Sequence, residues 1–280
     1  MSIRIITDSS ADLTLEDAQR LHIQQVHLHV QIGPKSYLAG RDLMPEEFYP
    51  LLRTEKEFPT TSQPSPDAFL QVFEEAKEAG DQVVCILLSS VLSGTYQSAK
   101  IAQGICGYDE IYLVDSLSAT AGVRLLAEQG CALRDAGLSA SEIARQLTEL
   151  VPRVHVWGVI DTLEYLYKGG RLNALQAGIG TVAKLKPLVG TKEGHVAVVG
   201  KAFGFAAGIK QLLKLMEDMP TDEQFPVYRL YTDDMERDVL LQEKLVEAGI
   251  SEERQIPCCI GPTIGTHLGP GGLGVAYIAK

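Results

Sequence analysis

Hydroxyl groups gather around one glycine in the stretch Ser89–Thr95, directly after the apolar run Val83–Leu88. Such a run is typical of a central parallel strand that is covered on both faces. Helical spacing begins after Gly94, so Ser93 is expected at the carboxyl edge of a sheet, beside the amino end of a helix. Hydroxyls placed there can join main-chain N–H groups in holding an anion. Plain helix capping by the same hydroxyls is the alternative that this stretch alone leaves open.

A second hydroxyl-rich stretch, Thr60–Pro66, also lies just before an expected helix and contains Thr61 and Ser62. Two such helix entrances in one domain suggest one divided cradle for an oxyanion, and a phosphate or a carboxylate fits it equally well. The chain has no GxxxxGK[ST] sequence, which excludes a P-loop. It also lacks GxSxG, so Ser93 does not have the strained turn that exposes the nucleophile of an α/β-hydrolase.

A cation is expected from the second half of the chain, where Arg171 follows Lys168 and two glycines. The paired glycines let the backbone bend sharply, and a guanidinium held after such a bend can make a forked contact with a carboxylate. A solvent-facing salt bridge at a helix end is the alternative.

His267 is the histidine for which we expect a functional role. It lies in Thr266–Gly272, where so many conformationally permissive residues predict a tightly shaped loop. A surface loop histidine is the alternative. His27 and His29 alternate with apolar residues on a strand and have no third ligand at metal spacing, so no metal site is predicted.

The helices and strands that position these residues are expected to follow different patterns before and after residue 150. Through residue 150, strands expected at 3–7, 26–32, 83–88 and 111–114 alternate with helices, which predicts a parallel sheet with helices on both faces. Later strands are expected at 154–160, 187–189, 196–199, 227–231, 256–260 and 275–278, and the short turn Lys192–His195 implies antiparallel pairing. We therefore predict an α/β protein of two domains, 1–150 with a parallel sheet and 151–280 with a mixed, largely antiparallel sheet.

Net charge, cysteine content and the amino-terminal sequence argue against several classes of function. The formal net charge of −11 and the absence of a basic cluster argue against nucleic acid and give no signal for membrane contact, although transient contact stays open. Five cysteines without a CxxC pair predict reduced thiols and no zinc site. The amino terminus lacks the pattern of a secretion signal and no eighteen apolar residues run together, so a cytoplasmic location is expected.

At this point the sequence resembles the DegV family of bacterial fatty-acid-binding proteins, which serve as the acyl-carrying subunit of fatty acid kinase. The resemblance spans essentially the whole chain and has no interruption at a motif. Six motifs, each weak alone, occur in the family's order: Thr7–Ser9, Thr61–Pro64, Leu92–Tyr96, Gly169–Leu172, Lys186–Pro187 and His267–Gly271.

The resemblance implies one long-chain fatty acid between two α/β domains, with its carboxylate at the interface and its tail inside the second domain. The carboxylate would be held by Thr61, Ser62, Ser93 and the amide of Gly94, while two residues of the second domain, Arg171 and His267, close over it. Which of the hydroxyls among residues 60–62 contributes most stays open.

The resemblance also implies a partner. An ATP-dependent kinase subunit would phosphorylate the carboxylate, and the acyl phosphate would feed phospholipid synthesis. This chain would then present its ligand without catalysing the reaction, and it would need no cofactor or metal.

An enzyme is the competing interpretation. A dihydroxyacetone-kinase-like protein or a small-acid phosphotransferase would act covalently through His267 or Ser93. A serine hydrolase would need a base for Ser93, which no motif identifies.

Overall fold

Four parallel strands form the first sheet. Its order is β2 (Ile23–Val26), β1 (Ile3–Asp8), β6 (Gln82–Leu87) and β7 (Ile111–Asp115). The computed structural model describes residues 2–172 and 184–280. The apolar run of β6 lies in the middle of the sheet and is buried on both faces, as its composition predicts. The predicted parallel sheet of the first half is therefore confirmed.

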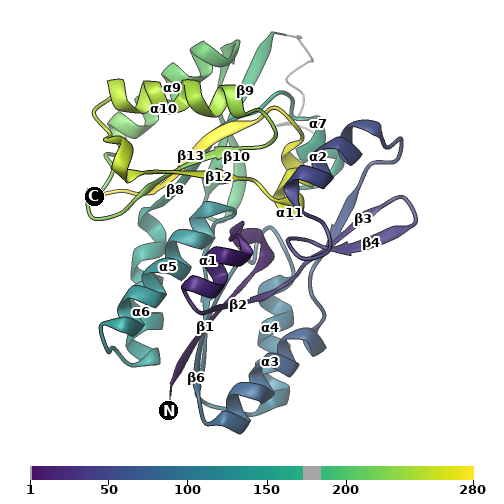
Figure 1. The fold of residues 1–280 in the computed structure, drawn as a ribbon, viewed down its shortest axis with the longest axis vertical. Helices are drawn as coiled ribbons and strands as arrows, with labels where there is room; N and C mark the ends of the chain where they lie inside the picture. Colours follow the sequence, from purple (N-terminus) through teal and green to yellow (C-terminus); the bar gives the residue numbers. More distant parts are fainter. Residues whose placement is uncertain (1, 173–183) are drawn as a thin grey trace.

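Helices cover both faces of this sheet (Figure 1). On one face, α3 (Pro66–Ala79) and α4 (Thr95–Cys106) pack against each other and against β6. On the other, α5 (Ala121–Asp135) and α6 (Ala140–Leu150) bury their apolar sides against the same strand. The short helix α1 (Leu15–Arg20) connects β1 to β2.

Hydroxyl side chains cap the starts of several helices. The Thr14 and Ser139 hydroxyls accept hydrogen bonds from the main-chain N–H groups three residues later, at 3.0 and 3.3 Å. Ser65 caps α3 in the same way, and Gly80 ends that helix in the left-handed conformation with φ of 69°.

The second sheet has six strands. Its order is β10 (His195–Phe203), β9 (Leu185–Lys192), β8 (Val154–Val159), β13 (Leu273–Ile278), β11 (Val227–Tyr231) and β12 (Gln255–Cys259). All neighbours pair antiparallel except β11 and β12. Helices α9 (Phe205–Asp218) and α10 (Met235–Glu247) pack on one face. The mixed, largely antiparallel sheet is confirmed, and β9 and β10 are longer than predicted.

The single strand predicted over 26–32 is wrong. The chain leaves the first sheet after Val26, and the Leu28 N–H donates to the Ser9 hydroxyl at 3.0 Å instead of to a neighbouring strand. Residues 29–32 then form β3 (His29–Ile32) in a separate sheet of order β4-β3-β5. This sheet also holds β4 (Lys35–Leu38) and β5 (Thr60–Ser62), with α2 (Pro45–Thr54) between them in sequence.

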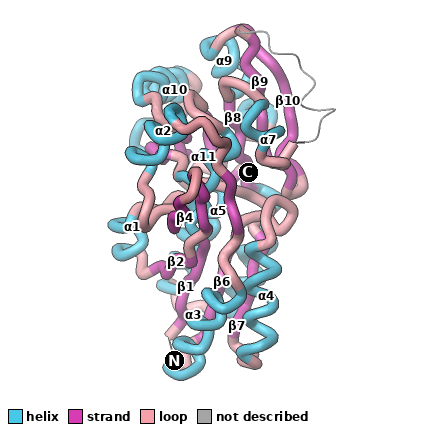
Figure 2. Tube along the Cα trace, turned by 90° about the vertical axis from the view of Figure 1, so that its right-hand side faces the viewer, coloured by secondary structure: helices cyan, strands magenta, loops and turns pink. Residues whose placement is uncertain are grey.

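The two large sheets lie one above the other, and Figure 2 shows β9 and β10 at one end of the molecule and α3 at the other. Helix α5 connects them, because its buried side chains contact β1 and β6 of the first sheet and β8 and β13 of the second. One continuous apolar core thus crosses the boundary predicted near residue 150. The division into two domains stays a prediction.

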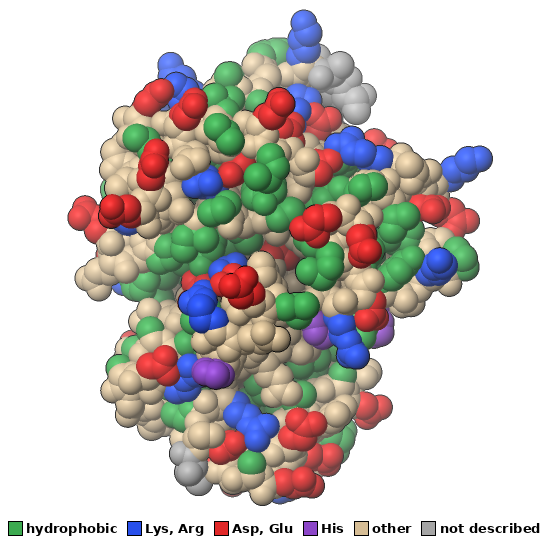
Figure 3. Space-filling model, viewed as in Figure 1, with side chains coloured by type: hydrophobic (Ala, Val, Ile, Leu, Met, Phe, Trp, Pro, Cys, Tyr) green, Lys and Arg blue, Asp and Glu red, His purple; other side chains and the backbone are tan. Residues whose placement is uncertain are grey.

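The surface carries charged side chains of both signs, and the cysteines are unpaired. On the face shown in Figure 3, acidic and basic side chains are intermixed over both lobes. All five cysteines are free thiols, and four of them are buried. Within residues 2–172 and 184–280, no helix combines the length and apolar character needed to cross a bilayer.

Candidate ligand site between the two sheets

Ser93 lies in the loop between β6 and α4, at the carboxyl edge of the first sheet as predicted. Its hydroxyl oxygen lies 2.9 Å from the Thr95 hydroxyl and accepts a hydrogen bond from the Thr95 N–H at 3.3 Å. Gly94 directly precedes the helix, and a Cβ atom at this position would lie 2.9 Å from the Gln63 side-chain nitrogen. The glycine therefore lets the second hydroxyl-rich stretch pack closely against the first.

The stretch Thr60–Pro66 leads into α3 as predicted, and within it Thr61 and Ser62 belong to strand β5. Strand β5 pairs antiparallel with β3, which turns neighbouring side chains to opposite sides. The Thr61 hydroxyl lies 2.8 Å from the Nε2 atom of His267, whereas Ser62 is exposed. Only the first of these two hydroxyls faces the second half of the molecule.

His267 lies in the short helix α11 (Pro262–Leu268), which corrects the loop predicted there. Its side chain is 8% exposed, and among the described residues its Nδ1 atom has no hydrogen-bond partner. Burial, together with the nearby positive charge of Arg171, lowers the pKa of His267 to about 3. The imidazole is therefore neutral at physiological pH.

Arg171 is positioned by the end of helix α7 (Glu164–Lys168). Gly170 adopts φ of 71°, a conformation that favours glycine, and a Cβ atom on Gly169 would lie only 2.2 Å from Nδ1 of His267. The two glycines thus permit the bend and the close approach of the histidine. The guanidinium donates to the main-chain oxygens of Leu92 at 3.2 Å and Gly169 at 2.6 Å.

The electrostatics of Arg171 suit an anion. Its side chain is half-buried, and burial lowers the pKa of its guanidinium from the ordinary value. Among the described residues no carboxylate lies within ion-pair distance of it. The solvent-facing salt bridge considered from the sequence is therefore not seen in that part of the chain, where the cation contacts carbonyl oxygens only.

A largely apolar cavity opens from this group of polar side chains. Its volume is about 100 Å³, on a scale where one water needs roughly 10 to 15 Å³. The predicted residues Thr61, Ser93, Arg171 and His267 line it, whereas Ser62 and Gly94 do not. Apolar side chains from the second large sheet, from α11 and from the loops that follow β2 and β6 form most of the wall, among them Leu28, Leu88, Val156, Ile160, Val189, Leu230, Ile264 and Leu273.

The turn between β9 and β10 closes one side of the cavity. The Ser89 hydroxyl donates to the Gly194 carbonyl oxygen at 2.8 Å, across the seam between the two halves. Thr191 and Val196, on either side of this turn, line the cavity. Ser89 therefore fastens the hairpin and does not face a ligand.

Among the polar residues that line the cavity, sequence reasoning missed Thr120, Thr191 and Thr263. Thr120 lies just before α5, and Thr263 is the second residue of α11. Pro262, a common first residue of helices, was the signal that could have revealed α11 and with it the shared face of Thr263 and His267.

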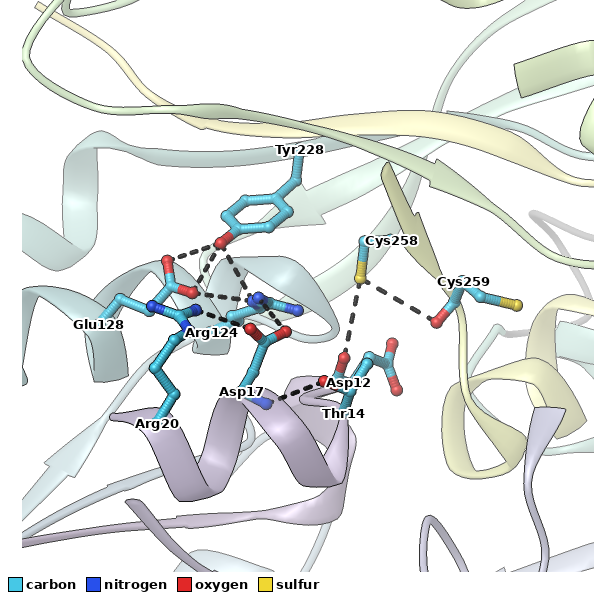
Figure 4. Close-up of polar contacts among 9 residues, drawn as sticks. All are labelled: Asp12, Thr14, Asp17, Arg20, Arg124, Glu128, Tyr228, Cys258 and Cys259. Atoms are coloured by element: carbon cyan, nitrogen blue, oxygen red, sulfur yellow. Dashed lines mark hydrogen bonds and ion pairs between the residues drawn. The ribbon is translucent and has the colours of Figure 1, made fainter. Parts of the chain in front are cut away.

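A second polar cluster lies elsewhere along the seam (Figure 4). Arg124 of α5 is 4% exposed and pairs with Asp17 at 2.7 Å and Glu128 at 2.9 Å. The Tyr228 hydroxyl donates to the Glu128 carboxylate at 2.6 Å and accepts from the Arg124 Nε at 3.0 Å. Every charge in this cluster has its partner within the chain.

Asp12 lies between the two polar clusters. Its carboxylate accepts a hydrogen bond from the Thr120 hydroxyl at 2.6 Å and another from the Gly261 N–H at 3.0 Å. Burial raises the pKa of Asp12 to about 7, although these hydrogen bonds favour the charged form. In the described part of the chain, no group of acidic, histidine and cysteine side chains could hold a metal ion.

The chain is similar to known proteins over nearly its whole length. A family model described as "Uncharacterised protein, DegV family" matches residues 2–280. A DegV domain-containing protein of Caldanaerobacter subterraneus subsp. tengcongensis is 36% identical over 283 residues, which cover 99% of both chains.

Two solved structures are similar over the whole chain. A DegV family protein from Thermus thermophilus, described as binding fatty acid, has a TM-score of 0.92 and 32% identity, with 100% of both chains covered. A stearic-acid-binding protein from Eubacterium ventriosum has a TM-score of 0.89 and 25% identity, with 100% of this chain and 99% of that chain covered.

Proposed function

The chain belongs to the DegV family, and on that premise we propose that it binds one long-chain fatty acid in the cavity between its two large sheets. The carboxylate lies at the polar end, beside Arg171 and His267, and the acyl chain extends along the apolar wall. The names of the related structures, which refer to fatty acid and stearic acid, support this choice of ligand.

One observation carries the proposal: a half-buried arginine, seen only with carbonyl partners in the described chain, borders an apolar cavity. A buried carboxylate is costly by several kcal/mol unless charged and hydrogen-bonding groups replace its water. Arg171, the one charged side chain among the described residues that line the cavity, lies with Thr61 and Ser93 at one end. This asymmetry suits a ligand with one anionic head and a long apolar tail.

The tail supplies most of the binding free energy. At roughly 0.8 kcal/mol for each buried methylene, sixteen carbons contribute on the order of 10 kcal/mol before the entropy losses of binding. A small phosphorylated acid would gain nothing from the apolar wall. The cavity therefore favours the carrier function over the phosphotransferase alternative.

The residues of the head-group site take different roles in this proposal. Arg171 provides the charge, while Thr61 and Ser93 donate hydrogen bonds to the carboxylate oxygens. Neutral His267 has one ring N–H and donates it from Nε2 to the Thr61 oxygen, which leaves the Thr61 proton for the carboxylate. Gly94 acts by letting the two hydroxyl-rich stretches meet, and Ser62 acts at most through its neighbour.

The proposed function also includes a partner protein, a kinase subunit that acts on the bound fatty acid. An ATP-dependent kinase subunit phosphorylates the bound carboxylate to an acyl phosphate that feeds phospholipid synthesis, and this chain presents the substrate. The chain has no P-loop and no kinase glycine-rich loop, which fits a presenter without catalysis of its own. Residues 1–150 form the domain of the carboxylate-binding loops, and 151–280 form the domain of the acyl chain.

Native mass spectrometry of the chain, purified without added lipid, tests the binding function. The expected spectrum shows an adduct with the mass of one fatty acid that disappears on denaturation. An adduct that survives denaturation on His267 or Ser93, or turnover of a small phosphorylated substrate by the chain alone, would instead establish the covalent enzyme. Acyl phosphate formed only when both ATP and the kinase are present would support the partnership.

A further inference from the structure

Thr120, Thr191 and Thr263 line the cavity in addition to the head-group residues, and Thr120 and Thr263 lie at the starts of α5 and α11. Thr263 is 2% exposed, and its hydroxyl has no hydrogen-bond partner among the described residues. An unpaired hydroxyl in a buried position is unfavourable, so such a group requires a partner that the described residues do not provide. The cavity is where that partner can lie.

Helical geometry relates Thr263 to the head-group site. It precedes His267 by four residues in α11, so the two side chains share one face of the helix, and both line the cavity. At 1.5 Å for each residue, they are about 6 Å apart along the helix axis. Thr266 of the same helix does not line the cavity, and its hydroxyl donates to the Pro262 carbonyl oxygen at 2.8 Å.

Thr120 supplies a complementary group. Its hydroxyl donates to one oxygen of the Asp12 carboxylate, and the Gly261 N–H donates to the other. Thr120 and the start of α11 are therefore fastened to the same side chain. Because the Thr120 proton is engaged by Asp12, the lone pairs of its oxygen are what it offers a ligand.

The backbone of Thr120 carries a second sign of a built site. Its φ is 49°, a rare conformation for a β-branched residue. Residues held in such conformations persist only where the surrounding structure fixes them, and they concentrate at functional sites. Here the hydrogen bond to Asp12 provides that constraint.

We infer that Thr263 and Thr120 form a second polar subsite, which selects fatty acids that carry a hydroxyl group on the acyl chain. The ligand hydroxyl accepts a hydrogen bond from Thr263 and donates one to the oxygen of Thr120. This inference rests on the proposed fatty acid binding and specifies its substrate class.

The spacing predicts where on the chain that hydroxyl lies. An extended chain advances roughly 1.2 Å for each bond, since three backbone bonds span about 3.6 Å. The separation of about 6 Å between Thr263 and His267 then corresponds to about five bonds. The hydroxyl should therefore be near carbon 6 and not at the far end of the chain.

The test compares affinities of the full chain, freed of lipid, for hexadecanoic acid and for its 2-, 6- and 12-hydroxy derivatives. In the parent protein, the 6-hydroxy acid should bind at least as tightly as the plain acid. In Thr263→Val, which keeps the shape but removes the hydroxyl, the ratio of the two affinities should shift about tenfold toward the plain acid. Thr263→Ser should retain the parent ratio.

Thr266→Val is the matched control, because it removes a hydroxyl of the same helix that does not line the cavity. It should leave the ratio within twofold of the parent value. An equal ratio in the parent and in Thr263→Val, or a preference greatest for the 12-hydroxy acid, would overturn the inference. Failure of the parent to bind hexadecanoic acid at all would instead refute the proposed function.

Discussion

Two arginines at the seam between the sheets differ in what their guanidinium groups contact. Arg124 is buried among carboxylates of its own chain, Asp17 and Glu128, and beneath it the Tyr228 ring lies 4.8 Å from its central carbon. Arg171 is half-buried, and in the described residues it meets only carbonyl oxygens. The charge of Arg124 is neutralised within the chain, whereas the described residues leave the charge of Arg171 available to an anion.

The pKa shifts follow the same division. Burial by itself would lower the pKa of Arg124, but its interactions with Tyr228 and Glu128 outweigh that effect and raise it. Burial lowers the pKa of Arg171, and no opposing interaction reverses the shift. A buried arginine therefore indicates an anion-binding site only where no carboxylate of the surrounding residues pairs with it.

Removal of the paired arginine should have the largest effect. Arg124→Met leaves Glu128 without its cation, whereas Asp17 keeps Arg20 at 2.6 Å, and we expect the free energy of unfolding to fall by roughly 3 kcal/mol. Urea unfolding followed by circular dichroism measures the change. Fatty acid affinity of the folded variant should stay within twofold, and a large loss of affinity would erase the distinction between the two arginines.

Removal of the available arginine should act on binding instead. Arg171→Ala is expected to weaken fatty acid affinity about ten- to hundredfold, because hydrogen bonds to a charged group are lost, with little change in the stability of the ligand-free protein. The thermal shift on adding fatty acid reports the affinity. Lys168→Ala, at an exposed lysine paired with Glu164, is the control that should keep the parent shift.

Asp12, which joins the two regions, should make stability depend on pH. Its folded pKa of about 7 exceeds the ordinary value of 3.8, so its contribution favours folding below about pH 4 and is lost as pH rises through 7. Asp12→Asn should therefore lose less unfolding free energy than the parent between pH 4 and 7. Parallel stability curves for the two proteins in denaturant titrations would contradict this assignment.

The smallest predicted effect concerns His267. A bound carboxylate beside the ring favours the imidazolium and should raise the His267 pKa from about 3 by about one unit. Titration of the ring by NMR, with and without fatty acid, measures the shift. An unchanged pKa would place the carboxylate away from this histidine and would weaken the proposed head-group site.

Much of the architecture could be predicted from local patterns. The apolar run of β6 and the short turn at Gly194 each act over a few residues, and each forms the expected strand or hairpin. The division of 26–32 between two sheets could not be predicted, because it depends on the contact of Leu28 with Ser9. Alternation alone cannot show which sheet a strand joins.

The ligand site could also be predicted only in part, because some of its contacts join residues far apart in the sequence. Thr61, Ser93, Arg171 and His267 were predicted together, and the structure brings them around one cavity. Sequence spacing could not show that Arg124 finds Asp17, which is 107 positions away. Nor could it separate Thr61 from Ser62, since their orientations depend on the pairing of β5 with β3.

Helix α5 has a consequence for how such proteins can be recombined. Its apolar side chains belong to one core with strands on both sides of residue 150, including Val156 of β8 and Ala276 of β13. A chimera that joins the first half of one relative to the second half of another would mismatch this shared packing. Such an exchange should succeed only when α5 and the strand residues that it contacts come from the same parent protein.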